Sequence, residues 1–324
     1  MTAEIDKSSR FYIAGHRGLV GSAVWRAAEG AGFENLIGRT SSELDLCDRD
    51  ATMAFFEAER PEVVVMAAAR VGGILANSTY PAEFISENLR VQVNVLDAAQ
   101  KFGVERLLFL GSSCIYPKHA EQPIREDSLM TGPLEPTNDA YAIAKIAGIL
   151  QVQAIRREYG LDYISAMPTN LYGPNDNFDL ATSHVLPALM RRAHEAKVTG
   201  AETMTIWGTG QPRREFMHVD DLARACLFLL SSYSDPNPIN IGTGSDIPIG
   251  ELAQLVADVV GWDGRIEYDH SKPDGTPRKL LDVSRLQALG FESSIDLATG
   301  VKDTYDWYCQ QADLAEGPVS HPSR

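Results

Sequence analysis

A thiol and two hydroxyls stand together where an apolar segment of the chain ends. The segment FLGSSCIYP (109–117) leaves a buried-looking run through a glycine and then places Ser112, Ser113 and Cys114 side by side. A cysteine thiol has an ordinary pKa of about 8.5, so it can exchange protons close to neutrality. Cys114 is therefore either a small residue at a strand end or an acid–base group. The residues alone leave both interpretations open.

A second candidate for chemistry is a tyrosine and a lysine four residues apart in DAYAIAKIAG (139–148). If this segment is helical, Tyr141 and Lys145 share one face and can project into the same site. A nearby ammonium stabilises phenolate and lowers the phenol pKa from its usual value of about 10. Lys145 can also bond the ribose of a nicotinamide cofactor, and Ser112 the carbonyl being reduced. The alternative is ordinary polarity on a helix surface.

Three glycines are placed to accommodate a phosphate group. In AGHRGLVGSAV, Gly15, Gly18 and Gly21 lie between a predicted strand and a predicted helix, with GxxGxxG spacing. Glycines allow a sharp turn and a close approach of the backbone to a pyrophosphate at the helix N-terminus. The context favours a dinucleotide site, although glycines between a strand and a helix can also form only a tight turn.

The residues after the second predicted strand predict which dinucleotide binds. An NAD site has an acidic residue there to bond the ribose 2′-hydroxyl, whereas this chain has Arg39. Arg39, together with Arg17 in the glycine loop, can pair with a 2′-phosphate, so we predict NADP(H). Both arginines could instead be solvated surface residues. Asp48 suits the adenine amino group, or it could equally be a helix N-cap.

The candidate catalytic and cofactor-binding residues must be held in place by a folded core. The pattern of apolar residues in the first half of the chain predicts what this fold is. Nearly continuous apolar runs alternate with helical patterns, which is typical of a parallel sheet covered on both faces. We predict an α/β fold with a doubly wound, Rossmann-type sheet. The predicted strands are 10–15, 34–38, 61–69, 105–112 and 162–170, and the predicted helices are 20–32, 48–60, 84–103 and 139–160.

The second half of the chain contains more glycine and proline, and its predicted secondary-structure elements are shorter. We predict that residues 1–172 form the NADP-binding domain and that residues 216–244 return to it. Residues 173–215 and 245–324 are then expected to form a smaller, mixed α/β substrate-binding domain.

Composition narrows the class of protein. The 324 residues carry a net charge of −15, which argues against a nucleic-acid or membrane surface as the main partner. The four cysteines are far apart and show no CxxC pairing, so we expect neither a metal site nor a disulfide framework. The N-terminus has no apolar leader pattern, and we expect a cytoplasmic protein.

Several motifs together resemble a known family. GHRGLVG, SSCIYP, YAIAK, PTNLYGP and REFMHVDD are similar to the extended short-chain dehydrogenase/reductases that act on nucleotide sugars. The likeness runs from residue 10 to residue 310 and includes ARVGGILAN and KPDGTPRKLLDVSRL. Within that family the chain resembles the epimerase/reductases of GDP-4-keto-6-deoxymannose. The resemblance implies inversion at C3 and C5 and then NADPH-dependent reduction of the C4 ketone.

The resemblance also implies a task for the thiol. Inversion next to a ketone needs one group to remove a proton and another to return one on the opposite face, and the family uses a cysteine and a histidine that match Cys114 and His184. Tyr141 and Ser112 would hold the enolate. Nucleotide-sugar dehydratases of the family carry an Asp-Glu pair where this chain has Cys114 and Ile115, so a dehydratase is disfavoured.

Other residues match the family's ligand contacts. Arg192 and Arg214 suit a diphosphate, and Trp207 can stack on the base or the sugar. The family places substrate contacts at these three positions and at Asp274, and Lys279 would close the rim. The alternatives are surface arginines, a core tryptophan and a plain turn. On the cofactor side, Asn170 matches the segment beneath the nicotinamide, and we also expect His184 to contact the cofactor.

The relatives also predict an oligomeric state for this protein. The helices at 84–103 and 139–160 build a homodimeric four-helix bundle in related proteins, so we expect a homodimer.

Two alternatives stay open for the function: an epimerase/reductase of another 4-keto nucleotide sugar, or a non-catalytic NADP(H)-binding regulatory protein. The complete set of catalytic candidates argues against the second alternative.

Overall fold

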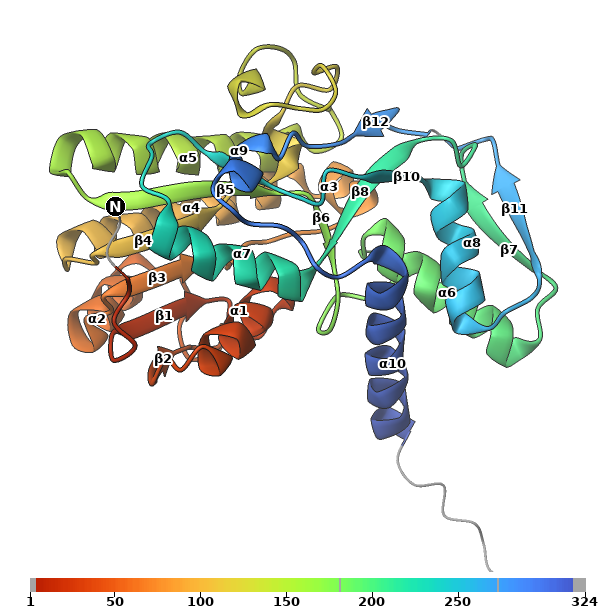
Figure 1. Ribbon diagram of the computed structural model, residues 1–324, viewed down its shortest axis with the longest axis horizontal. Helices are drawn as coiled ribbons and strands as arrows, with labels where there is room; N and C mark the ends of the chain where they lie inside the picture. The colour runs from red at the N-terminus through yellow and green to blue at the C-terminus, as the bar shows by residue number, and fades with distance from the viewer. Residues whose placement is uncertain (1–3, 181, 273, 317–324) are drawn as a thin grey trace, which may run out of the picture.

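A six-stranded parallel sheet forms the centre of the larger half of the molecule (Figure 1). The computed structural model describes residues 4–180, 182–272 and 274–316, so the outer ends of the predicted parts 1–172 and 245–324 lie outside it. The strand order is β2-β1-β3-β4-β5-β9, and every neighbouring pair is parallel. The strands are β1 (Arg10–Ala14), β2 (Asn35–Ile37), β3 (Val63–Met66), β4 (Arg106–Leu110), β5 (Asp162–Pro168) and β9 (Ile239–Ile241).

Helices cover both faces of this sheet. Apolar side chains of α1 and α7 pack on one face, and those of α2, α4 and α5 pack on the other (Figure 1). From β1 the chain goes to β2, which lies on one side of β1 in the sheet. It then crosses back to β3, which lies on the other side of β1. This is the predicted doubly wound fold, which the structure confirms. The helices are α1 (Leu19–Gly30), α2 (Arg49–Glu59), α4 (Pro81–Lys101), α5 (Asp139–Tyr159) and α7 (Val219–Ser232).

Local sequence explains where these helices begin and end. Asp48 caps α2, because its carboxylate accepts a hydrogen bond of 3.0 Å from the Ala51 amide. The helix α4 has Pro81 at its first position, where no intrahelical amide bond is lost. The helix α5 ends at Gly160, whose φ of 69° is left-handed and favours glycine.

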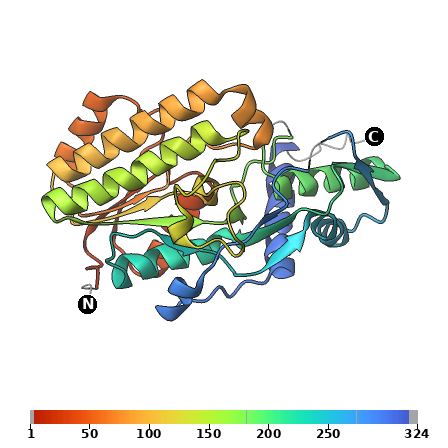
Figure 2. The same cartoon turned by 90° about the horizontal axis from the view of Figure 1, so that it is seen from above.

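The smaller half has its own sheets and its own apolar core. The strands β10, β8 and β12 form a sheet in that order, β6 pairs with β8, and β11 pairs with β7. Apolar residues of α6, α8 and α10 pack together with residues of β7 and β8. Figure 2 shows this half at the opposite end of the molecule from the paired helices α4 and α5. Its elements are β6 (Asn170–Tyr172), β7 (Thr203–Trp207), β8 (Arg213–His218), β10 (Asp246–Pro248), β11 (Arg265–Asp269), β12 (Arg278–Lys279), α6 (Val185–Thr199), α8 (Ile249–Val260) and α10 (Leu297–Glu316).

Most predicted elements differ from the observed ones by one to three residues at an end, and two differences are larger in their consequences. The strand predicted at 162–170 divides into β5 and β6, because β6 leaves the large sheet to pair with β8. The helix predicted at 84–103 begins earlier, at Pro81. The short helices are α3 (Ile74–Thr79), η1 (Ser113–Ile115), η2 (Glu126–Ser128) and α9 (Ser284–Ala288).

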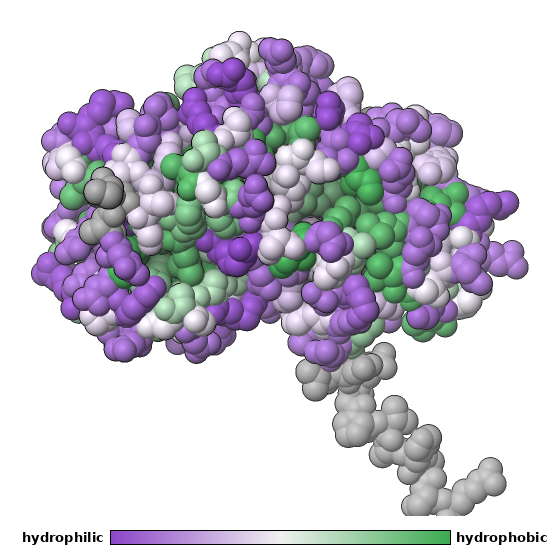
Figure 3. All heavy atoms as spheres, viewed as in Figure 1, coloured by the Kyte–Doolittle hydropathy of each residue, from purple (hydrophilic) through white to green (hydrophobic). Residues whose placement is uncertain are grey.

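The outer surface is mostly hydrophilic on the face drawn in Figure 3, and apolar atoms are seen mainly in its recesses. Over the described residues, every helix falls short of the length and apolarity needed to cross a lipid bilayer.

Candidate functional site

The glycine loop lies at the point where the strand order reverses, between β1 and β3. Gly15 has a φ of +82°, and a Cβ atom on it would come within 2.9 Å of the Ala68 backbone after β3. A Cβ atom on Gly21 would lie 2.1 Å from the Gly15 carbonyl, so the loop and α1 can pack this closely only around glycine. The Gly18 amide donates a 3.0 Å hydrogen bond to the Gly15 carbonyl and closes the turn. The turn and the α1 N-terminus therefore fit a pyrophosphate.

Arg17 and Arg39 lie around one region beyond the carboxyl end of β2. Both guanidinium charges act on the same neighbours, helping to lower the pKa of Glu43 and that of His16. Arg17 is exposed, whereas Arg39 forms an ion pair with Glu59. This positive region fits the additional phosphate of NADP(H). Asp48 acts as the N-cap of α2, which was the alternative interpretation of that residue.

Ser112 and Cys114 lie just beyond the carboxyl end of β4, at the same edge of the sheet as the glycine loop. The Ser112 hydroxyl accepts a 3.2 Å hydrogen bond from the Cys114 amide and begins the short helix η1. This turn leaves the Cys114 side chain half-buried at the edge of the sheet. The chain therefore leaves the sheet through a turn that fixes the thiol next to a hydroxyl.

Tyr141 and Lys145 come to the same edge from the first turns of α5. The Lys145 ammonium donates a 2.9 Å hydrogen bond to the Leu110 carbonyl and lies 5.9 Å from the centroid of the Tyr141 ring. Burial lowers the pKa of Lys145 to about 8. Burial and the charge of Cys114 raise the pKa of Tyr141, and a hydrogen bond with Ser112 only partly offsets this. The expectation that Lys145 lowers the phenol pKa is therefore wrong for this arrangement, since burial dominates.

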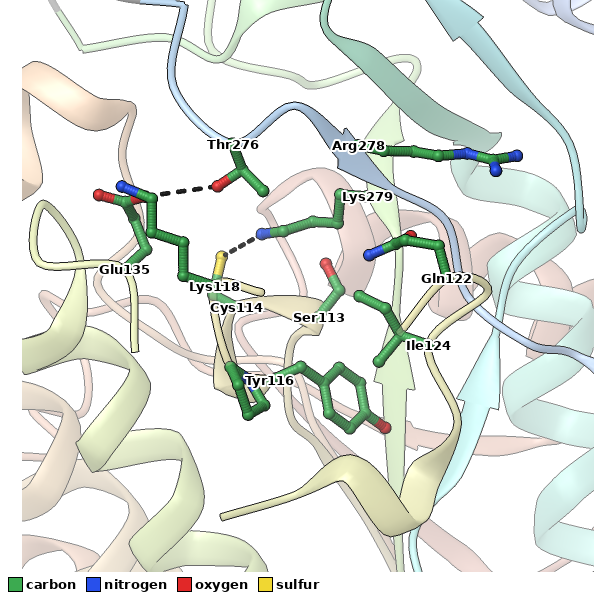
Figure 4. Close-up of a pocket in the computed structure, with 11 residues that line it drawn as sticks. Ser113, Cys114, Tyr116, Lys118, Gln122, Ile124, Glu135, Thr276, Arg278 and Lys279 are labelled. Atoms are coloured by element: carbon green, nitrogen blue, oxygen red, sulfur yellow. Dashed lines mark hydrogen bonds and ion pairs between the residues drawn. The ribbon is translucent and has the colours of Figure 1, made fainter. Parts of the chain in front are cut away.

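The Lys279 ammonium points at the Cys114 thiol (Figure 4), and the charge of Arg214 also acts on this thiol. Burial alone would raise its pKa, but Lys279, Ser112 and Arg214 together lower it below the ordinary value. The Lys279 ammonium lies 3.5 Å from the sulfur. The strand β12 pairs with β8 so that Lys279 stands beside Arg214, which brings both cations to the thiol. The sequence placed Lys279 at the rim of the substrate site, and the structure places it against Cys114.

His184 is the residue immediately before α6, and its side chain makes no capping bond there. Burial among neighbouring protein atoms lowers the pKa of the His184 ring, and the charge of Lys279 lowers it further. The charge of Lys279 therefore acts on both predicted acid–base groups, Cys114 and His184.

The other predicted substrate residues lie further out in the smaller half. Arg192 donates a 3.3 Å hydrogen bond to the Thr205 carbonyl. Trp207 is 52% exposed, so it is not a core tryptophan. The Asp274 carboxylate accepts a 2.6 Å hydrogen bond from the Thr209 amide and so holds the turn after β7. On the cofactor side, the Asn170 amide donates a 2.7 Å bond to the Glu215 carbonyl.

A pocket next to the thiol contains side chains that the sequence did not single out. Lys118 and Glu135 form an ion pair of 3.0 Å within it, and the Thr276 hydroxyl lies 3.4 Å from the same Glu135 oxygen. Glu135 begins the segment EPTNDAYAIAKIAG, which is part of the family resemblance, but no charge or spacing pattern in the sequence marked it as a pocket residue. Within the described ranges, no group of three or more His, Cys, Asp or Glu residues is placed to hold a metal ion.

The glycine turn at the strand reversal and the serine, tyrosine and lysine at the neighbouring strand end are the parts of a nucleotide-dependent oxidoreductase site. Residues 11–242 match the model of the NAD dependent epimerase/dehydratase family, and the chain belongs to this family.

Close relatives carry a more particular name. The chain is 59% identical to GDP-L-fucose synthase 1 of Arabidopsis thaliana over 94% of each chain. It is 52% identical to GDP-L-fucose synthase of Escherichia coli (strain K12), over 95% of this chain and 99% of that one. A GDP-L-fucose synthetase of Naegleria fowleri, solved bound to NADP, aligns with a TM-score of 0.89 and 29% identity over 96% of each chain.

Proposed function

We propose that this chain makes GDP-L-fucose from GDP-4-keto-6-deoxy-D-mannose, by epimerisation at C3 and C5 and then reduction of the C4 ketone by NADPH. The observation that carries this proposal is the contact between Cys114 and Lys279, next to Ser112 and Tyr141. A reductase alone needs no activated thiol at this position. The names of the relatives support the same substrate and product.

The cofactor in this proposal is NADP(H). When bound, NADPH supplies the hydride for the reduction. The backbone of the turn at Gly15, Gly18 and Gly21 would hold its pyrophosphate, and Arg17 and Arg39 would pair with its 2′-phosphate. Lys145 would bond the nicotinamide ribose, and Asn170 and His184 would lie near the ring. Asp48, which caps α2, is the proposed contact of the adenine amino group.

The epimerisation requires proton transfers on both faces of the sugar ring. The lowered pKa of Cys114 favours the thiolate, which is the form that removes a proton from a carbon next to the ketone. His184, on which the charge of Lys279 also acts, would return a proton on the opposite face. The hydroxyls of Ser112 and Tyr141 would donate hydrogen bonds to the enolate oxygen in the meantime.

The reduction requires a proton for the oxygen of the new alcohol. The raised pKa of Tyr141 keeps the phenol protonated at neutral pH, so that it can donate this proton. Ser112, which interacts with Tyr141, would orient the carbonyl. Lys145 is fixed by the Leu110 carbonyl, where it can hold the cofactor ribose next to Tyr141.

The substrate would extend from this edge into the smaller half. Arg192 and Arg214 would pair with the diphosphate, Trp207 would stack on the base or sugar, and Asp274 would line the rim, whereas Lys279 would contact the substrate next to Cys114. In this proposal the large half (1–172 and 216–244) holds the cofactor. The rest of the chain holds the nucleotide sugar.

A second candidate function is epimerisation and reduction of another GDP-linked 4-keto sugar. A GDP-L-colitose synthase of Yersinia pseudotuberculosis is 36% identical to this chain over 93% of its length and 98% of that protein. A GDP-6-OMe-4-keto-L-xylo-heptose reductase of C. jejuni aligns with a TM-score of 0.91 at 35% identity, covering 95% of this chain and 100% of that one. The higher identity to the GDP-L-fucose synthases favours the first candidate.

Two further parts of the proposal concern the assembly and the location of the protein. The adjacent helices α4 and α5 expose Val93, Ile143 and Leu150, which would pair with a second copy to form a homodimeric four-helix bundle. The unpaired cysteines suit a reducing compartment, so we place the protein in the cytoplasm.

The test is incubation of the purified protein with NADPH and GDP-4-keto-6-deoxymannose, with products identified by NMR. We expect one NADPH oxidised per GDP-L-fucose formed, and slower turnover with NADH. GDP-mannose, which has no ketone, is the control and should not oxidise NADPH. Absence of NADPH oxidation with every 4-keto nucleotide sugar tried would contradict both candidate functions.

A further inference from the structure

A carboxylate lies in the pocket next to the activated thiol, although the proposed substrate is an anion. Glu135 precedes α5 and lines the same pocket as Cys114 and Lys279. Its side chain is 19% exposed, and its charge also acts on Arg214. A carboxylate repels a diphosphate, so this residue does not bind that part of the ligand. The groups that a carboxylate recognises well are hydrogen-bond donors such as hydroxyls.

Neighbouring side chains hold Glu135 ionised. Burial would raise its pKa, but the ion pair with Lys118 and hydrogen bonds from Thr137 lower it below the ordinary value. Three of its contacts are long: 3.4 Å from the Thr137 amide, 3.3 Å from the Thr137 hydroxyl and 3.4 Å from the Thr276 hydroxyl. Only the Lys118 contact, at 3.0 Å, is short. A carboxylate offers about four acceptor sites, and Glu135 has four partners, but the three long contacts are weak enough for a ligand hydroxyl to replace one of them.

The segment around β12 brings this carboxylate to the reacting part of the sugar. Thr276 contacts Glu135, and three residues later Lys279 contacts the Cys114 sulfur (Figure 4). A sugar carbon held at Cys114 would direct one of its substituents toward the pocket that Glu135 lines. A 4-keto-6-deoxyhexose joined to its nucleotide through C1 retains only two free hydroxyls, at C2 and C3.

We propose that Glu135 is a specificity-determining residue that accepts a hydrogen bond from the C2 or C3 hydroxyl of the sugar. This inference rests on the proposed function and adds the group that distinguishes sugars which retain these hydroxyls from their deoxy analogues. Lys118 and Thr276 act through Glu135, because they fix the orientation of its carboxylate. Arg192 and Arg214 remain the partners of the diphosphate.

The experiment compares a ligand that has a sugar with one that has none. The affinities of GDP-mannose and of GDP are measured by titration calorimetry for the native protein, Glu135→Gln and Glu135→Ala. A hydrogen bond to a charged group predicts that GDP-mannose binds about tenfold more weakly to Glu135→Gln, and more weakly still to Glu135→Ala. GDP affinity should stay unchanged in both variants. Glu121→Gln, which alters an exposed carboxylate of the same loop region, is the matched control and should change neither affinity.

Other results would overturn the inference in distinguishable ways. Equal losses for GDP-mannose and GDP would mean that Glu135 supports the diphosphate site through Arg214. Unchanged GDP-mannose affinity in both variants would mean that it contacts no sugar hydroxyl. If the native protein bound neither GDP nor GDP-mannose, the proposed function would fail first and this inference with it.

Discussion

Burial and charge act in opposite directions on the cysteines of this chain. Cys226 is buried in the apolar core of α7, and burial raises the pKa of its thiol to about 12. Cys114 also experiences burial, but Lys279, Ser112 and Arg214 together more than offset it, and its pKa is lowered. The same residue type is therefore inert in one place and ionisable in the other. The difference comes from the neighbouring Ser112 and from two cations more than 90 residues away in sequence.

The first prediction concerns Tyr141, the proposed proton donor in the reduction of the ketone. Tyr141→Phe keeps the ring but removes the proton donor, so ketone reduction should fall by roughly 10²–10⁴-fold. NADPH affinity, measured by fluorescence titration, should stay close to that of the native protein. Tyr159→Phe, at the exposed end of the same helix, is the control and should reduce the ketone normally. Near-normal turnover of Tyr141→Phe would mean that another group protonates the ketone.

At the scale of the element, a buried carboxylate joins the segments that carry the two cations. Glu215 of β8 is fully buried, and its side chain accepts hydrogen bonds from the Thr243 and Gly244 amides, each at 2.7 Å. It also accepts a 3.1 Å bond from the Leu281 amide, just after β12. Glu215 thus connects β8, the turn after β9 and the segment after β12. This connection fixes Lys279 relative to the large sheet.

A substitution at Glu215 should therefore weaken the fold. In Glu215→Gln one acceptor oxygen becomes an NH₂ group that faces an amide donor, so we expect the free energy of unfolding to fall by about 1–3 kcal/mol. Urea denaturation measures this change. Glu267→Gln, on the exposed strand β11, should alter stability by less than about 0.5 kcal/mol. Equal stability of the two variants would contradict the role assigned to Glu215.

The elements also show which parts of the structure could be predicted from the sequence. The apolar strands and amphipathic helices of the large half have strong local patterns, and the motifs at Gly15 and Ser112 lie at predicted strand ends, with Tyr141 in a predicted helix. The short strands β10 and β12 carry no such pattern, because pairing with β8 defines them. The contact of Lys279 with Cys114 depends on this pairing. The pKa of Tyr141 was mispredicted because burial cannot be read from spacing.

At the scale of the whole molecule, an acidic chain contains a cationic site. The net charge of −15 contrasts with the arginines and lysines gathered around the thiol and the glycine loop. Such a contrast favours a small anionic ligand over an extended polyanion. Apolar residues are exposed on α4 and α5, the two long helices that lie side by side along the large half (Figure 2). A dimer through these helices would leave the site of each copy accessible.

If the protein is a dimer through α4 and α5, charged residues introduced on these helices should separate the two copies. Leu150→Asp and Val93→Asp place carboxylates on the exposed faces of α5 and α4, so the protein should become monomeric because each dimer would bury them. Light scattering coupled to size-exclusion chromatography measures the mass. Val198→Asp, on the 71% exposed Val198 of α6, is the matched control and should remain dimeric. A native protein of monomer mass would exclude this assembly.

The role of Cys114 is decided by hydrogen exchange at the carbons next to the ketone. GDP-4-keto-6-deoxymannose is incubated with the protein in D₂O without NADPH, and mass spectrometry follows deuterium uptake, so that epimerisation is observed apart from reduction. Cys114→Ser should slow uptake by at least about 10²-fold, because a serine hydroxyl does not ionise near neutrality. NADPH should still bind to this variant, and Cys47→Ser should exchange at the native rate. Native deuterium uptake in Cys114→Ser would contradict the acid–base role and leave Cys114 a small side chain at the end of β4.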